Sequence, residues 1–230
     1  MPMEWYFVLI FVMGILIIIT VGSYWWFKAN FVLSPTEKIT ENIVSIKNGI
    51  VNIYIYTKSS DSIIVDAGFS IKGMKKELRK MDIIPDKITD VFITHSDLDH
   101  IGGLSIFTKA NIYFGKDSKV KKLNNYKFLG DNDVVMVGSI KVQAISTPGH
   151  RIGHTSYLID NKYLFSGDLL RLKANEVKPF FKIISSDFTN LLESIRKVAK
   201  LENVKMLLTA HTGYTAEFDK GIESWKPHSK

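Results

Sequence analysis

Cysteine is absent from this chain of 230 residues, and histidine occurs only six times. Without thiols the protein cannot form disulfides, zinc–thiolate sites or a cysteine nucleophile, so any metal must be held by histidines and carboxylates. The length allows one domain with an appendage and leaves no room for a second domain of ordinary size. The net charge of +7 fits an anionic partner, and it fits a lysine-rich solvated surface equally well.

Charge is also missing from the segment Trp5 to Phe27, an aliphatic run with aromatic residues clustered at both ends. About 20 apolar residues are needed to cross the hydrocarbon layer, and aromatic residues favour its two interfaces. The segment therefore predicts a retained anchor that contacts the lipid bilayer. A cleaved signal peptide is disfavoured because the residues before the run hold Glu4 and no Lys or Arg, and because no small-x-small cleavage site follows.

Basic residues occur only beyond this run, at Lys28, Lys38 and Lys47 in the first fifty residues. The positive-inside rule then predicts a single-pass membrane protein whose main domain faces the cytoplasm. We expect an anchor at residues 1–29, a linker with Pro35 at residues 30–42, and the main domain at residues 43–230.

Short apolar, β-branched runs and two stretches with helical periodicity organise this domain. The runs predict strands at residues 42–48, 51–58, 62–68, 90–95, 110–115, 133–147, 155–168 and 204–211. Apolar residues at helix spacing predict helices at 70–83 and 188–199, the second capped by Ser186 or Asp187. The order of the elements predicts an α/β (α+β) fold with sheets covered by helices.

Four candidate metal ligands are crowded into "VFITHSDLDHIGG", namely His95, Asp97, Asp99 and His100. His95 and Asp97 are two residues apart after an apolar strand, so they point the same way in an extended chain, whereas Asp99 and His100 are adjacent and point differently. One loop thus presents two pairs of ligands. Two cations a few Å apart can each receive one pair, which a single cation cannot easily do.

Further ligand-type residues follow three other predicted strands: His150 in "STPGH", Asp168 in "FSGD" and His211 in "LLTAHTG". Any one of them alone would be an ordinary polar residue at a strand end. Their repetition after successive strands indicates that they complete the shells of the two cations.

This set of motifs resembles that of the metallo-β-lactamase-like hydrolases, whose pattern is H-x-H-x-D-H, a His after "TPG", an Asp in "GD" and a C-terminal His. The resemblance covers Ile43 to the end of the chain. It implies a four-layer αβ/βα sandwich with the metals at one edge. It also implies two metal ions, and the ligand sets it assigns are His95, Asp97 and His150 for one, Asp99, His100 and His211 for the other, and Asp168 as the bridge.

Two more residues gain a role from the resemblance. Asp66 in "IIVDAG" matches a family aspartate that supports the metal loops. His154 is expected to pack beside the ligands, because the seven ligands are complete without it.

Asp97 departs from the family pattern, in which most members have a second histidine at this position. That histidine binds through Nδ1, and an aspartate oxygen reaches almost the same point. The added carboxylate makes the shell harder, so we expect two divalent ions, with Zn²⁺ first and Mn²⁺ or Fe²⁺ as alternatives. A similar H-x-D-x-D-H motif followed by "IGGL" occurs in the hydrolase-like domain of bacterial competence channel proteins, which carry many spans.

The chemistry expected from such a centre is hydrolysis. Two cations hold a shared water as hydroxide, so no serine or cysteine nucleophile is needed, and Asp99 is the candidate to orient the hydroxide and move its proton. Only 19 residues follow His211, which argues against the glutathione-binding helical domain of hydroxyacylglutathione hydrolases. We therefore expect a small-molecule ester, lactone or thioester substrate. The segment Leu169–Lys182 is expected to shape its pocket, and Arg171 and Lys173 are either anion contacts or solvated charges.

Two other classes of function stay open. A phosphodiesterase or nuclease acting on DNA or a nucleotide would suit the basic pI of about 9.3 and the H-x-D-x-D-H motif. It ranks below acyl hydrolysis because the lysines are scattered along the chain. A non-catalytic metal-binding membrane protein is the other alternative, which Asp97 would permit. No feature of the sequence indicates the oligomeric state.

Overall fold

The computed structural model describes residues 3–120, 125–174 and 176–226, apart from the side chains of residues 3–5 and 7. The chain divides into two compact units, Met1–Val32 and Leu33–Lys230. The first unit is the helix α1, Met3–Asn30. Its stretch Val8–Asn30 has a mean hydropathy of 2.4 and no buried residues, so by length and composition it could cross a membrane. A signal sequence near an N-terminus can meet the same criteria of length and composition.

Most of the segment predicted as a linker, residues 30–42, belongs to the second unit. Strand β1, Glu37–Lys38, pairs with the following strand of the main sheet. Ser34 is also held to the domain, because its backbone N–H donates to Asn52 Oδ1 at 2.9 Å and its carbonyl accepts from Asn52 Nδ2 at 2.8 Å. The fold therefore begins about ten residues before the predicted boundary at residue 43.

Two sheets form the frame of the second unit, and each contains parallel and antiparallel pairs. The first sheet has seven strands, in the spatial order β1, β2 (Ile43–Asn48), β3 (Val51–Lys58), β4 (Asp61–Val65), β5 (Asp90–Phe92), β6 (Asn111–Gly115) and β7 (Tyr126–Leu129). The second has six, in the order β15 (Gly213–Thr215), β14 (Met206–Thr209), β11 (Tyr163–Phe165), β10 (Thr155–Ile159), β9 (Ile140–Ser146) and β8 (Val134–Val137). A small hairpin pairs β12 (Leu170–Lys173) with β13 (Glu176–Pro179).

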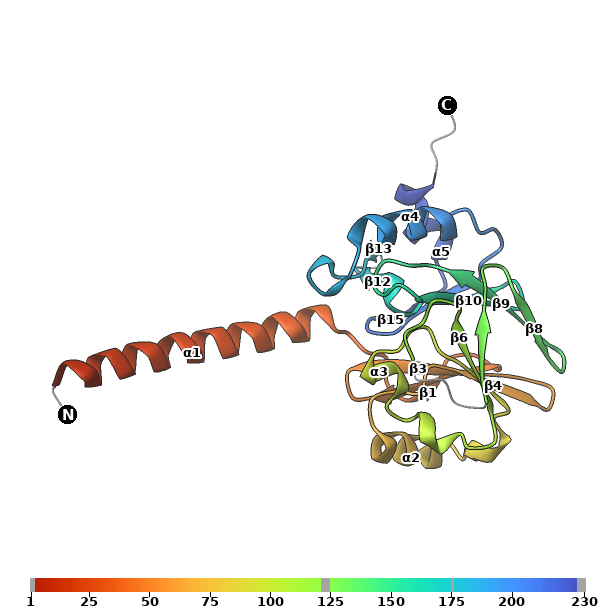
Figure 1. The fold of residues 1–230 in the computed structure, drawn as a ribbon, viewed down its shortest axis with the longest axis horizontal. Coiled ribbons are helices and arrows are strands. Elements are labelled where there is room, and N and C mark those ends of the chain that lie inside the picture. The colour runs from red at the N-terminus through yellow and green to blue at the C-terminus, as the bar shows by residue number, and fades with distance from the viewer. Residues whose placement is uncertain (1–2, 121–124, 175, 227–230) are drawn as a thin grey trace. The chain divides into compact units, whose positions relative to one another are not determined.

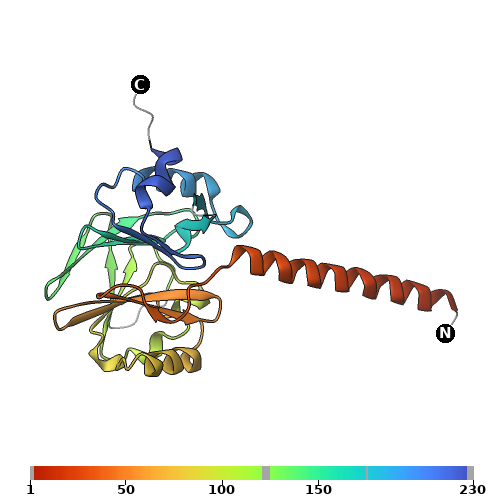
Figure 2. The ribbon, with the colours of Figure 1, turned by 180° about the vertical axis from the view of Figure 1, so that it is seen from behind.

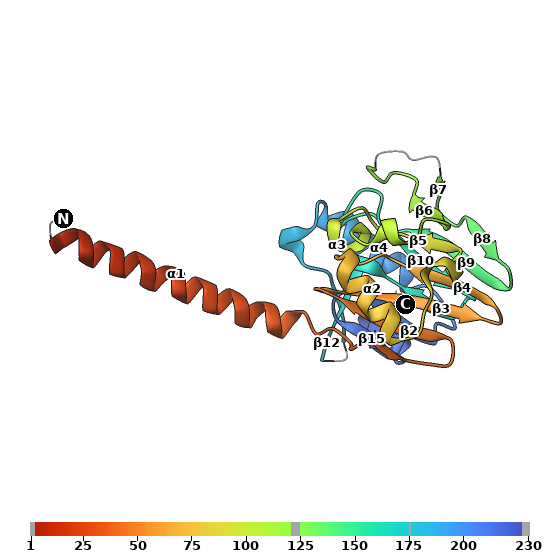
Figure 3. The same ribbon diagram turned by 90° about the horizontal axis from the view of Figure 1, so that it is seen from below.

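The sheets lie face to face with helices on their outer faces (Figures 1 and 2). The α-helices of this unit are α2 (Ile71–Lys80), α3 (Leu98–Ile101), α4 (Phe188–Val198) and α5 (Phe218–Ile222). Short 3₁₀ turns are η1 (Pro85–Lys87), η2 (Leu104–Ile106), η3 (Gly167–Leu169), η4 (Lys182–Ile184) and η5 (Glu223–Trp225). Helix α2 covers the first sheet, as the view from below shows (Figure 3), and α4 and α5 lie over the second.

An apolar core fills the space between the sheets. Phe92 stacks on Tyr113 and meets the edge of Tyr157, which comes from the opposite sheet. The buried Tyr157 hydroxyl donates to the Ile93 carbonyl at 2.8 Å, so the same side chain also ties the sheets together next to His95. Aromatic contacts of this kind and a satisfied buried hydroxyl fix the spacing of two sheets.

The two predicted helices form where their apolar residues repeat at helix spacing. Met74 and Leu78 of α2 are buried against the first sheet, and Ser70 caps the helix by accepting from the Gly73 N–H. Of the two caps predicted for α4, Asp187 is the observed one, because its Oδ1 accepts from the Asn190 N–H at 3.0 Å.

Gly149 allows the loop after β9 to lie directly against α4. Its φ is +142°, and a Cβ at this position would lie 2.3 Å from the backbone of Leu191. The Asp187 N–H donates to the Gly149 carbonyl at 2.8 Å, and Ser194 Oγ donates to the Pro148 carbonyl at 2.7 Å. The loop that carries His150 is therefore fixed to a helix.

Gly149→Ala should destabilise the domain by more than about 1 kcal/mol, because alanine disfavours this φ and its methyl group would force the loop away from α4. Urea unfolding of the full-length chain in detergent measures the change. Gly130→Ala is the control, since Gly130 makes no backbone contact of this closeness. Equal midpoints for the two variants would contradict the close packing of this loop.

Candidate metal centre

Parallel strand pairs bring the predicted site residues to one edge of the domain. In the first sheet Val65 of β4 pairs with Phe92 of β5, so the loops that begin at Asp66 and Ile93 leave the sheet side by side. In the second sheet Phe165 of β11 pairs with Leu208 of β14, which places the turn holding Asp168 beside the one holding His211. The carboxyl ends of neighbouring parallel strands lie at the same edge, and ligands gather there.

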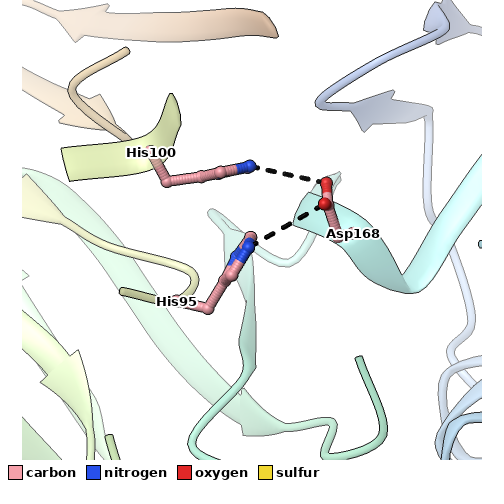
Figure 4. A group of neighbouring side chains, drawn as sticks. All are labelled: His95, His100 and Asp168. Carbon is pink, nitrogen blue, oxygen red and sulfur yellow. Dashed lines mark ion pairs between the residues drawn. The ribbon is translucent and has the colours of Figure 1, made fainter. Parts of the chain in front are cut away.

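Asp168 lies at the centre of this group, and its two oxygens face different pairs of histidines. Oδ2 is 3.8 Å from His95 Nε2 and 3.5 Å from His150 Nε2. Oδ1 is 3.6 Å from His100 Nε2 and 3.2 Å from His211 Nε2. Figure 4 shows His95 and His100 directed at the two oxygens from one side. This is the arrangement expected of a carboxylate that bridges two cations.

The remaining carboxylates complete two similar groups. Asp97 Oδ2 is 3.6 Å from His95 Nε2 and 3.4 Å from His150 Nε2. Asp99 Oδ2 is 3.7 Å from His100 Nε2 and 3.4 Å from His211 Nε2. Three groups have ligand atoms within 4.8 Å of one another, and they are His95, Asp97 and His150; Asp99, His100 and His211; and His95, His100 and Asp168. The structure thus brings all seven predicted ligands together, in the predicted sets.

The spacing of these atoms fits cation ligands better than direct hydrogen bonds. Ligand atoms at about 2.0–2.1 Å from a tetrahedral metal lie about 3.3–3.4 Å apart, whereas N–H···O bonds join atoms at about 2.9 Å. Within the part of the chain that the structure describes, Nε2 of His95, His100 and His150 and Oδ1 of Asp168 are buried without a hydrogen-bonding partner. Buried polar atoms without partners are rare, and cations bound between these ligand groups would satisfy them.

The outer nitrogens of three histidines are held by contacts that direct Nε2 of each ring towards the group of candidate ligands. His100 Nδ1 donates to Asp66 Oδ2 at 2.8 Å, and His211 Nδ1 donates to the Ile50 carbonyl at 2.6 Å. His95 Nδ1 lies 3.1 Å from Thr94 Oγ1, which in turn donates to Asp66. Such outer bonds fix the ring and its tautomer. Asp66, which adopts a left-handed φ of +64°, thus contacts both His100 and the Thr94 hydroxyl beside His95.

His154 contacts the backbone of Asp168. Its Nε2 accepts from the Asp168 N–H at 3.1 Å, while Nδ1 lies 3.1 Å from the Thr147 carbonyl. Gly167 makes this approach feasible, because its φ is +52° and a Cβ there would lie 2.7 Å from Thr94 Cβ and 2.9 Å from His154 Nε2. His154 thus packs beside the ligands, as predicted, and holds the turn of Asp168.

Burial and neighbouring charges both shift the pKa values of these groups. Burial lowers the pKa of His95 to about 4, and the neighbouring His100 acts in the same direction. Burial also lowers the pKa of His100, but the carboxylates of Asp66 and Asp168 outweigh it and raise the value to about 10. For Asp168 burial raises the pKa, yet His211 and His100 hold it well below its usual range. The Asp168 carboxylate is therefore an anion.

Sequence reasoning missed three side chains of the site. Thr94 links Asp66 to His95, as described above. Arg151 donates through Nε to Asp97 Oδ1 at 2.9 Å and pairs through Nη2 with Oδ2 at 2.6 Å. Phe180 stacks on the His211 ring at 5.5 Å and meets the His150 ring edge-on at 5.0 Å, and all three side chains are buried. Hydroxyl, guanidinium and phenyl groups are too common for their spacing to reveal such roles.

A cavity of about 250 Å³ opens beside the ligands. Its lining residues are His95, Ser96, Asp117, Ser118, Lys119, Arg151, Ile152, Gly153 and Ser186. The segment Leu169–Lys182, expected to shape the pocket, does not line this cavity. The Arg171 guanidinium lies over the Phe181 ring at 4.6 Å, and its Nε donates to the Pro179 carbonyl at 3.0 Å. Arg171 is thus packed within its own hairpin, and the segment reaches the site through Phe180 instead.

Residues 46–211 match the metallo-beta-lactamase superfamily, and with this fold and edge site the chain belongs to that superfamily. Solved structures confirm the predicted fold. An archaeal superfamily protein from Sulfolobus tokodaii is 22% identical with a TM-score of 0.63, and the match covers 80% of this chain and 84% of that one. A family protein from Thermus thermophilus is 15% identical with a TM-score of 0.64, covering 81% and 79%.

Curated relatives carry the name hydroxyacylglutathione hydrolase. The protein from Buchnera aphidicola is 25% identical over 161 residues, which are 68% of this chain and 60% of the relative. That from Dictyostelium discoideum is 36% identical over 151 residues, which are 60% and 54%. The chain thus spans little more than half the length of these relatives. The superfamily and these relatives imply a dinuclear metal site, which the residues present here fit.

Elemental analysis of full-length protein purified without chelator should find about two metal ions per chain. His100→Ala and Asp168→Ala should each lower this number, because each removes a ligand atom from a buried group that no other described side chain replaces. Asp86→Asn, on the exposed turn η1, is the control and should match the parent. A single ion per chain in metal-saturated parent protein would contradict a dinuclear centre.

Proposed function

We propose that this protein is a membrane-tethered, dinuclear metal-dependent hydrolase that cleaves an ester, lactone or thioester. The observation that carries the proposal is the pair of ligand groups that share Asp168, one group facing each of its oxygens. His95, Asp97 and His150 would hold one ion, and Asp99, His100 and His211 the other. Zn²⁺ is our first choice, because four imidazoles suit it, and the three carboxylates keep Mn²⁺ or Fe²⁺ as alternatives.

Two ions so placed supply a water activated at neutral pH and a Lewis acid for a substrate oxygen. Asp99 is the residue that we propose to orient the attacking water and to move a proton to the leaving group. Its side chain is 20% exposed and faces His211 and His100, whereas the carboxylate of Asp97 is engaged by Arg151. Of the two outer carboxylates, Asp99 therefore has more freedom to change its partner during a reaction.

Exposed apolar side chains around the centre support an acyl substrate. The exposed side chain of Leu98 lies between Asp97 and Asp99 in the sequence. Ile152, which is also exposed, lines the cavity beside the metal ligands. Ile183 is 88% exposed, and its neighbour Ile184 is also exposed while its carbonyl accepts from Arg151. Surface apolar groups gathered at a functional site favour a partly apolar ligand over a polyanion.

The relatives named above also support this choice, because a hydroxyacylglutathione hydrolase acts on a thioester. The chain spans only 60% and 54% of these two relatives, so their glutathione-containing substrate is not carried over to it. We therefore propose the bond type, a carboxylic ester, lactone or thioester, and leave glutathione recognition to the relatives.

A phosphodiesterase is the second candidate, and the outer face of α2 favours it. This face has a shallow hollow lined by Ile71 and by the basic side chains Lys72, Lys75, Lys76, Arg79 and Lys80. Such a surface would attract a nucleic acid or another polyanion. The apolar residues around the metal ligands place this candidate second.

Helix α1 supports the tether. Its segment Trp5 to Phe27 is free of charge, and the stretch Val8–Asn30 is long and apolar enough for one crossing. With Lys28, Lys38 and Lys47 following this segment, we propose a cytoplasmic hydrolase domain.

A substrate screen with full-length protein in detergent, loaded with Zn²⁺ or Mn²⁺, tests the reaction class. The screen uses ester, lactone, thioester and phosphodiester reporters. We expect turnover of at least one of the three acyl reporters and no turnover of the phosphodiester reporter. Cleavage of the phosphodiester alone would reverse the order of the two candidates. Two bound ions without turnover of any reporter would favour the non-catalytic alternative.

The same assay tests Asp99. Asp99→Asn keeps an oxygen in place and should retain most of the metal, yet its turnover should fall by about 10²-fold or more because an amide cannot carry the proton. Asp86→Asn again serves as the control. Parent-like turnover in Asp99→Asn would refute the role given to Asp99.

Membrane fractionation tests the tether, and protease treatment of intact cells tests the orientation. We expect the chain to resist carbonate extraction and its hydrolase domain to be protected from external protease. Extraction into the soluble fraction would contradict the anchor, and digestion from outside would contradict the cytoplasmic placement.

A further inference from the structure

Arg151 makes a two-point contact with Asp97, the residue that stands where most members of the family have a histidine. Nε donates to Oδ1 at 2.9 Å, and Nη2 pairs with Oδ2 at 2.6 Å. Oδ2 is also the oxygen that faces His95 Nε2 and His150 Nε2, at 3.6 and 3.4 Å. One carboxylate is thus shared between a guanidinium and a group of metal ligands.

The guanidinium is itself held by the backbone on its other side. Nη1 donates to the His150 carbonyl at 2.7 Å and to the Ile184 carbonyl at 2.9 Å. Arg151 therefore joins the loop of Asp97, the loop of His150 and the turn η4. A fork anchored at three nitrogens has one orientation available, so it restricts where the Asp97 carboxylate can lie.

The charge of this pair is the second part of the argument. A histidine ligand at position 97 would be neutral, whereas Asp97 adds a negative charge to a centre that already holds the carboxylates of Asp99 and Asp168. Arg151 adds one positive charge at contact distance. The negative charge of Asp97 and the positive charge of Arg151 cancel. The site therefore has the same net charge as one with a neutral histidine at position 97 and no arginine at position 151.

We propose that Asp97 and Arg151 act as one unit that replaces a neutral histidine ligand, with Arg151 as a positioning residue. Arg151 keeps Oδ2 directed at the His95 and His150 ring nitrogens and offsets the charge that Asp97 introduces. This inference rests on the proposed metal centre, since it concerns how one of the two ions is held.

An ordinary ion pair between loops would show the same two contacts, and its effect would be limited to stability. Exposed pairs contribute about 0–1 kcal/mol. The proposed unit differs because it predicts that residue 151 and residue 97 are coupled in metal affinity, and that the sign of the coupling depends on which ligand occupies position 97.

The test is a double-mutant cycle in the full-length protein in detergent, with Zn²⁺ as the probe. The variants are Arg151→Gln, Asp97→His and the double variant. Competition with a chromophoric chelator gives the Kd of each ion, and urea unfolding of the metal-free protein gives stability separately. Arg171→Gln is the control, because its guanidinium lies over the Phe181 ring and not at the ligands.

Arg151→Gln should raise the Kd of one ion by about tenfold or more and leave the other less affected, as expected for loss of a ligand's supporting contact. Asp97→His should also bind more weakly, because Arg151 then faces a neutral ring beside a cation. The double variant should bind more tightly than Asp97→His alone. Arg151→Lys, which keeps the charge but loses the fork, should give an intermediate Kd.

Additive effects of the two substitutions on Kd, or a parent-like Kd in Arg151→Gln, would overturn the inference, as would effects limited to the urea midpoint. Failure of the underlying metal centre has a different signature, because the parent protein would then bind fewer than two ions before any substitution.

Discussion

The whole centre depends on one buried anion, the carboxylate of Asp168, which lies between two pairs of imidazoles. Burying a charge is costly unless it is compensated. Each oxygen of Asp168 faces two Nε2 atoms at 3.2–3.8 Å. Its backbone N–H is also engaged, by His154. The parallel pairing of β11 with β14 sets this residue beside His211, so the architecture of the second sheet decides where the ligands can converge.

The seven ligands could be predicted because their side chains have few other reasons to follow successive strands. Strand ends are readable from apolar runs, and His or Asp at such ends in series is a distinctive pattern. The contacts of Thr94 and Arg151 could not be read in this way. Their partners, Asp66 and Asp97, are 28 and 54 residues away in the chain, and neither residue type suggests such a contact by its position.

Some elements of the fold were beyond sequence reasoning for a different reason. Helix α3 has four residues and α5 has five, so neither completes two turns over which a period could be recognised. Strands β12 and β13 have four residues each and form an isolated hairpin. Only tertiary contacts, such as those of Phe180 just after β13 with the rings of His150 and His211, show what the segment after Asp168 contributes to the site.

Much of the order at this edge exists before any cation is considered. The outer nitrogens of His100 and His211 are already bonded, and Asp66 and Gly167 hold left-handed backbone conformations that fit the loops together. Non-glycine residues in this conformation persist where the surroundings determine it, and they are common at functional sites. The scaffold thus fixes the ligands in advance, which lowers the entropy lost when an ion binds. Because Nε2 of His95, His100 and His150 is buried and unsatisfied in the described structure, an ion that binds there would also stabilise the fold itself.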